Sequence, residues 1–185
     1  MVKPRIYTKR GDDGTTGLLY GGRVPKDSRQ IELNGVVDEA QAALGLARAE
    51  SEPGSELDDR LVALARDLYV LMAEVATSPA NRPKLVAGTT LVTADMVTEL
   101  EHGIDDLIQR FDMPSDFTIP GENRRAAALD LARTIVRRAE RLAVTDQVEG
   151  SLVCTYLNRL SDLLWAMARW QEGPEHHKLS KQIRG

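Results

Sequence analysis

The stretch RRAAALDLARTIVRRAERLAV, residues 124–144, decides the fold that this chain predicts. Its apolar residues recur at steps of three and four, the spacing that places side chains on one face of a helix. They are Ala126, Leu129, Ala132, Ile135, Val136, Ala139 and Leu142. A second face carries polar residues at the same spacing, namely Arg133, Arg137, Glu140 and Arg141. The pattern predicts a helix with one apolar stripe for a core and one stripe rich in guanidinium groups.

The guanidinium-rich stripe has two interpretations. Arginine offers a planar fork of donors that fits phosphate oxygens, which favours an anion-binding surface. Charged runs more often face water, and an ion pair within the helix, such as Arg137 with Glu140, would then explain the pattern. Taken alone, the stripe favours the second interpretation.

Outward from this helix, similar periodicity predicts four more helices. The first runs from Ser28 or Ile31 to Glu50, and the second carries an apolar stripe over residues 57–75. The third begins at Thr93, a plausible N-cap, and the last covers about residues 152–172. Residues 76–92 are expected to form a connecting loop. The chain therefore predicts an all-α protein, a five-helix up-and-down bundle over residues 32–172. The whole chain, 1–185, is expected to be one domain, with a mobile polar tail at 173–185.

Composition limits the possible functions. The chain has 185 residues and a formal net charge of −4, so it is not expected to bind nucleic acid, and any anion site must be a local cluster. The single cysteine, Cys154, excludes a disulfide framework and is expected to be a buried, inert thiol. Three histidines without metal-ligand spacing predict no protein metal site. Because no long apolar run or signal sequence appears, we expect a cytoplasmic protein that makes no contact with membranes.

The stretch YTKRGDDGTTGL, residues 7–18, is the second unusual feature. Its glycines permit close backbone approach, and its threonines and lysine supply donors, as in a phosphate cradle built from a loop. It lacks the Gly-Lys-Ser/Thr of a Walker A loop and the acidic alternation of an EF-hand. The alternative is a pair of tight turns, because Asp13-Gly14 is a favoured turn dipeptide. A further cluster at Arg23, Lys26, Ser28 and Arg29 adds some weight to phosphate binding.

Taken together, these motifs resemble the PduO-type ATP:cob(I)alamin adenosyltransferases over nearly the whole chain. The resemblance depends on their order and spacing, since each motif alone is weak. The motifs are TKRGDDGTTGL at 8–18, VPKDS at 24–28, Asp38-Glu39, FTIPG at 117–121, ARTIVRRAER at 132–141 and YLNRLSD at 156–162.

The resemblance implies a five-helix bundle that forms a homotrimer with active sites between subunits. It implies transfer of the 5′-deoxyadenosyl group of ATP to cob(I)alamin, with Mg²⁺ on the phosphates and triphosphate as the leaving group. An ATP-binding arm at residues 1–31 of one subunit would supply Thr8, Lys9, Arg10, Gly11, Asp12, Gly14, Thr16, Lys26 and Ser28. The next subunit would supply Arg133, Arg137, Glu140 and Asn158.

The resemblance also implies three catalytic roles. Arg133 would neutralise the leaving phosphates and pair with Asp38 across the interface. Phe117 would occupy the lower face of the corrin and displace its axial base, which makes cob(II)alamin easier to reduce; the alternative is that Phe117 plugs the end of the bundle. The sequence offers no obvious general base, and the reaction needs none because cob(I)alamin is itself a strong nucleophile. A cobalamin reductase and a B12-dependent mutase are possible partners.

Some positions depart from the family pattern. Glu122 follows Pro-Gly where a small residue is common, Asp130 stands where histidine is frequent, and Gln41 replaces asparagine. The segment between Arg141 and Tyr156 looks shorter than usual. These departures concern the corrin side more than the ATP side. Two other functions therefore stay open: a regulatory bundle that binds ATP without turnover, and a chaperone-like bundle that hands finished cofactor to a mutase.

Overall fold

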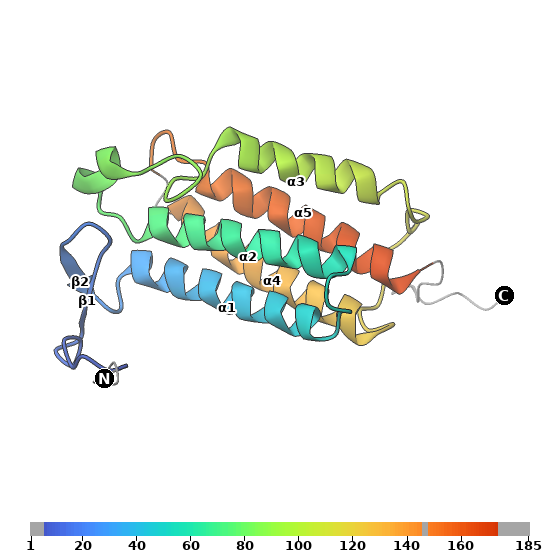
Figure 1. The fold of residues 1–185 in the computed structure, drawn as a ribbon, viewed down its shortest axis with the longest axis horizontal. Helices are drawn as coiled ribbons and strands as arrows, with labels where there is room; N and C mark the ends of the chain where they lie inside the picture. The colour runs from blue at the N-terminus through green and yellow to red at the C-terminus, as the bar shows by residue number, and fades with distance from the viewer. Residues whose placement is uncertain (1–5, 146–147, 174–185) are drawn as a thin grey trace.

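A computed structural model describes residues 6–145 and 148–173 of the chain. Of the predicted mobile tail at 173–185, all but the first residue lies outside the described ranges. Five long helices run side by side along a common axis and confirm the predicted bundle (Figure 1). They are α1 (Arg29–Ala49), α2 (Glu56–Val75), α3 (Ala94–Leu107), α4 (Arg124–Thr145) and α5 (Val153–Glu172). The smaller elements are β1 (Thr15–Gly17), β2 (Arg23–Pro25) and a 3₁₀ helix, η1 (Pro79–Lys84).

Helix α4, the stretch quoted first, packs against both α1 and α5. The predicted apolar stripe faces the core: Leu129, Ala132, Val136 and Ala139 are fully buried, while Leu142 is half-buried. The small buried side chains of Ala126, Ala132, Ala139 and Ala143 let the neighbouring helices approach closely. The remaining packing is by α1 against α2 and by α3 against α5.

Side-chain caps fix the starts of α3 and α4. The Thr93 hydroxyl accepts from the amide of Met96 at 3.3 Å, which confirms Thr93 as the N-cap of α3. Asn123 caps α4 by accepting from the amide of Ala126 at 2.9 Å, and its side-chain amide also donates to the carbonyl of Gln171 at 2.7 Å. The start of α4 is thereby attached to the end of α5.

Two boundaries differ from the sequence expectation. Helix α3 ends at Leu107, although apolar periodicity continues to Phe111; that ring instead packs edge-on against Trp165 at a centroid distance of 6.1 Å. The expected loop at 76–92 contains η1, which Pro79 begins because its fixed φ suits a first helical turn. No helix in the described ranges is long and apolar enough to span a membrane.

Candidate functional site

The glycine-rich arm folds as a small hairpin beyond the start of α1 (Figure 1). Strands β1 and β2 pair antiparallel with Thr16 opposite Val24. Before β1 the chain turns through left-handed backbone at Lys9 (φ 60°) and Gly14 (φ 79°). The motif therefore forms the tight turns that its Asp-Gly dipeptide indicates. Most of its predicted phosphate-binding residues lie within these turns.

Gly11 is the position on the arm where a side chain would crowd its neighbours. A Cβ atom built there would lie 3.1 Å from both Cε and Nζ of Lys26 and 3.2 Å from the carbonyl oxygen of Thr15. The backbone amide of Lys26 also donates to the carbonyl of Gly14 at 2.9 Å. The ammonium group of Lys26 is thus placed directly beside the glycine-rich turn.

Arg23 holds this turn together. Its Nε and one Nη nitrogen donate to the Thr15 hydroxyl at 2.8 and 2.6 Å, and that Nη nitrogen also donates to the carbonyl oxygen of Arg10 at 2.5 Å. The Asp13 carboxylate accepts from the amide and hydroxyl of Thr15 at 2.9 and 2.8 Å; these bonds, together with nearby Arg23, lower the pKa of Asp13. From the sequence, Arg23 was assigned to a cluster of residues that would bind phosphate. In the structure its guanidinium instead donates hydrogen bonds to Thr15 and Arg10 of the arm.

The predicted ATP-binding residues of the arm divide by exposure. Exposed residues supply its donors and charges: Thr8, Lys9, Arg10, Asp12 and Lys26, along with the exposed Gly14. Thr16 and Ser28 are half-buried, and the hydroxyl oxygen of Ser28 is buried without a hydrogen-bond partner in the described part of the chain. Three of the predicted ATP-binding residues, Lys9, Arg10 and Lys26, are therefore exposed cations.

The hairpin docks on the junction of α2 and η1. The amide of Leu19 donates to the carbonyl of Ala76 at 2.9 Å, and the side-chain amide of Asn81 lies 3.3 and 3.4 Å from the carbonyl oxygens of Tyr20 and Gly21. The Tyr20 hydroxyl lies 3.4 Å from that of Thr90. Among the described residues, no hydrogen bond joins the arm to α4.

The second predicted half of the site lies on α4 and α5. The Asn158 amide donates to the Glu140 carboxylate at 2.8 Å, which brings together two residues that are 18 positions apart. Arg159 then donates to the Asn158 side-chain oxygen at 2.6 Å. The ion pair suggested between Arg137 and Glu140 does not form; Arg137 is exposed and makes no ion pair with the described residues. Its charge is available to an anion.

Cys154 lies one turn before Asn158 on α5 and is only partly buried. Burial raises the pKa of its thiol, and the negative charge of Glu140 adds to the rise. The thiol therefore stays protonated and is a poor nucleophile, as the sequence predicted, although it is less buried than expected.

Arg133 lies nearer the middle of α4, about 18 Å along the axis from the end at Thr145. Its Nε donates to Asp130 at 3.0 Å, and its two terminal nitrogens make no hydrogen bond within the described ranges. Asp38 is exposed on α1. The predicted pair of Arg133 with Asp38 joins two subunits and so stays a prediction in the structure of one chain. A neighbouring ion pair, Arg138 with Glu39, ties α4 to α1.

Phe117 and Arg133 line the same cavity, of about 620 Å³, at the end of the bundle away from the arm. Trp165 and the loop at residues 113–118 form other walls. The Phe117 side chain is 81% exposed, so it does not plug the bundle end as the alternative interpretation would require. The cavity instead presents an exposed aromatic ring beside an open guanidinium fork.

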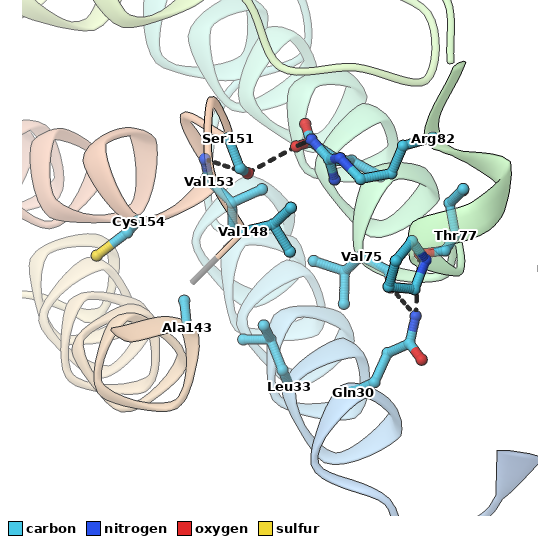
Figure 2. Close-up of a pocket in the computed structure, with 12 residues that line it drawn as sticks. Gln30, Leu33, Val75, Thr77, Arg82, Ala143, Val148, Ser151, Val153 and Cys154 are labelled. Carbon is cyan, nitrogen blue, oxygen red and sulfur yellow. Dashed lines mark hydrogen bonds and ion pairs between the residues drawn. The ribbon is translucent and has the colours of Figure 1, made fainter. Parts of the chain in front are cut away.

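A smaller cavity of about 200 Å³ opens at the other end, between α1, α2, α4 and α5 (Figure 2). Apolar side chains such as Leu33, Val75 and Ala143 line most of it. At one side lies Glu74, which is 1% exposed and accepts from Arg82 at 2.9 Å and from the Ser151 hydroxyl at 2.6 Å. Sequence reasoning missed Glu74, because it stands beside the apolar stripe of α2 with partners far along the chain.

The fold and the site define a helical-bundle protein with a basic, glycine-rich arm at one end and an aromatic-cationic cavity at the other. A model of the cobalamin adenosyltransferase family matches residues 6–171. The corrinoid adenosyltransferase of Citrobacter freundii is 37% identical over 171 residues, which cover 91% of this chain and 95% of that protein. That of Mycobacterium tuberculosis H37Rv is 38% identical over 170 residues, 89% of this chain and 87% of its relative.

A solved structure extends the likeness to three dimensions. A variant PduO-type ATP:corrinoid adenosyltransferase from Lactobacillus reuteri, complexed with cobalamin and ATP, superposes with a TM-score of 0.84 at 27% identity, covering 96% of this chain and 98% of that one. This chain belongs to the cobalamin adenosyltransferase family. The family that the sequence motifs resembled is thereby confirmed.

Proposed function

We propose that this protein transfers the 5′-deoxyadenosyl group of ATP to cob(I)alamin and releases adenosylcobalamin and triphosphate. Membership of the family and the full-length likeness to a relative complexed with both ligands support this activity. The observation that carries it is the cavity that Phe117 and Arg133 both line. This cavity contains an exposed aromatic ring and a guanidinium group whose terminal nitrogens make no hydrogen bond with the described residues. An adenosyl transfer needs both a corrin surface and a group that stabilises leaving phosphate.

The arm at residues 1–31 would bind ATP. Its exposed Lys9, Arg10 and Lys26 supply positive charge, and the Gly11 turn admits the Lys26 ammonium at close range. Backbone amides and cations of this kind bind phosphate oxygens. Mg²⁺ would enter with ATP, bound to its phosphate oxygens.

The catalytic step needs charge stabilisation and positioning. Arg133 and Arg137 would neutralise the triphosphate as the bond from C5′ to oxygen breaks and the cobalt–carbon bond forms. The Glu140–Asn158 pair would meet the nucleoside, because it presents polar atoms beside Arg137. Phe117 would cover the lower face of the corrin and exclude the axial base. Holding C5′ close to cobalt in a dry site supplies much of the remaining rate.

A homotrimer with sites between subunits accounts for the separation of the arm from Arg133 within one chain. In such an assembly the Arg133 terminal nitrogens, which have no described partner, would meet Asp38 of the adjacent subunit. Delivery of electrons by a cobalamin reductase and transfer of product to a B12-dependent mutase complete the proposal. We place the protein in the cytoplasm, where ATP is available.

The test is a spectral assay with MgATP and chemically reduced cobalamin, followed for adenosylcobalamin and for triphosphate. We expect both products from the native protein, with strong loss in Arg133→Ala and little loss in Arg66→Ala, which removes an exposed arginine on α2. Binding of ATP without product would refute the enzyme activity and favour a regulatory bundle. Near-normal turnover by Arg133→Ala would refute the role given to that residue.

A further inference from the structure

The wall of the Phe117 cavity contains a buried cluster of charged side chains. Arg169 on α5 is 2% exposed, and its Nη2 donates to Asp130 of α4 at 2.5 Å. The guanidinium also pairs with Glu172 at 2.8 Å and donates from Nη1 to the hydroxyl of Thr118. The second oxygen of Asp130 accepts from Nε of Arg133. Five residues from α4, α5 and the loop before α4 thus share one connected network.

The cluster is balanced in charge. Arg169 and Arg133 each carry one positive charge, and Asp130 and Glu172 each carry one negative charge. A buried guanidinium is costly unless paired and hydrogen-bonded. Both terminal nitrogens of Arg169 are hydrogen-bonded, and its Nε lies 2.8 Å from the Glu172 carboxylate. Its guanidinium carbon also lies 5.7 Å from the centre of the Trp165 ring. These contacts fix the position of the Arg169 guanidinium, so it can in turn hold the groups that accept its hydrogen bonds, Thr118 and Asp130.

One of the groups it binds belongs to the loop that carries Phe117. Thr118 is the next residue, so its Cα atom lies about 3.8 Å from that of Phe117. Fixing the Thr118 hydroxyl on Arg169 restricts the backbone that carries the exposed ring. Asp130 also accepts a hydrogen bond from Nε of Arg133. This bond orients the Arg133 guanidinium and leaves its two terminal nitrogens available to a ligand. The two functional groups of the cavity thus share the Asp130–Arg169 pair as a support.

We propose that Arg169 is a positioning residue that couples the Phe117 loop to Arg133 through Asp130. This inference rests on the proposed function, because it assigns the coupling to the corrin-side ring and the phosphate-side guanidinium of that reaction. The network depends on Asp130, one of the positions at which the sequence motifs depart from the family pattern that they resemble. Arg169 supplies a buried partner for the carboxylate at that position.

The hydroxyl of Thr118 provides a clean test, since Thr118→Val removes the bond to the loop and keeps the buried ion pair. We expect kcat from cob(II)alamin to fall about tenfold, the effect of losing a hydrogen bond to a charged group. The KM for ATP should stay within about twofold of the native value, because the arm is untouched. Thr118→Ser, which keeps the hydroxyl, should restore kcat. Thr98→Val, at an exposed position on α3, is the matched control.

A second measurement needs no turnover. In the ligand-free protein, both Thr118→Val and Asp130→Asn should speed amide hydrogen exchange of residues 113–119, while Thr98→Val should not. Equal kcat for Thr118→Val and Thr98→Val, or unchanged exchange in the loop, would overturn the coupling. Absence of adenosylcobalamin from the native protein would instead refute the proposed function, and the exchange data would still decide whether the loop is tied to Asp130.

Discussion

Replacing Glu74 by glutamine should destabilise the end of the bundle that carries the arm. The Glu74 carboxylate is 1% exposed and accepts from Arg82 at 2.9 Å, from Ser151 at 2.6 Å and from the amide of Val92 at 2.8 Å. It therefore joins η1, the segment before α3 and the start of α5 to one point on α2. Glutamine keeps the shape and one acceptor oxygen, but it turns an NH₂ group toward one of these three donors.

The expected cost follows from the burial of the pair. Breaking a buried ion pair by removing one charge costs about 3–5 kcal/mol. Arg82 is 19% exposed and can recover some hydration, so we take the lower end, about 3 kcal/mol. For a chain of this size each kcal/mol lowers Tm by about 2–4 °C, which gives a fall of about 6–12 °C.

The assay is thermal unfolding by calorimetry, combined with hydrogen exchange. Exchange should rise in η1 and in the arm, because Asn81 of η1 holds the carbonyl groups of Tyr20 and Gly21. Glu52→Gln, at an exposed loop position, is the control and should leave Tm unchanged. A Tm for Glu74→Gln within about 2 °C of native, less than the effect of 1 kcal/mol, would refute the reasoning.

Three further outcomes are expected. Phe117→Ala should slow the reaction from cob(II)alamin more than that from cob(I)alamin. Equal losses of rate in the spectral assay for adenosylcobalamin would show that the ring does not act on the axial base. Lys9→Ala should raise the KM for ATP with little change in kcat; an unchanged KM would remove the exposed arm cation from the phosphate site. Asp67→Asn should keep the hydrogen bond from the Tyr156 hydroxyl, now 2.9 Å from the carboxylate. Burial raises the pKa of Asp67, so its ionisation costs stability as the pH rises from about 4 through the folded-state pKa. The variant should therefore have a Tm at about pH 7 equal to or above native and should match native near pH 4; a variant that is less stable only at the higher pH would contradict this sign.

The sequence was sufficient for the helices because their signal is local. Steps of three and four placed Leu129, Val136 and Ala139 on the buried face of α4, and a lone threonine marked the start of α3. The glycine motif indicated a turn, and the hairpin contains it. Where the physical cause lies within a few residues, the prediction was reliable.

The partners within the site could not be predicted in the same way. Arg169 binds side chains 39 and 51 positions earlier, and nothing in its own helix distinguishes it from a surface arginine at a C-terminus. Arg23 looked like a phosphate ligand because its charge is evident from the sequence, whereas its acceptors are set by the hairpin. Asp130 looked like a defect until its two arginine partners were seen. Such pairings depend on tertiary geometry, which a single sequence does not encode locally.

The attachment of the arm to the α2–η1 junction, and not to its own α4, has a genetic consequence. Under the proposed trimer, every active site takes its arm from one chain and its α4 from another. Lys9→Ala, which binds ATP more weakly, and Arg133→Ala, which lowers turnover, would then complement each other at ATP concentrations below the raised KM. When the two are mixed and allowed to exchange subunits, some sites in the hybrids contain neither change. Mixed trimers should regain a fraction of native turnover, and a cell carrying both alleles would be healthier than one carrying either alone.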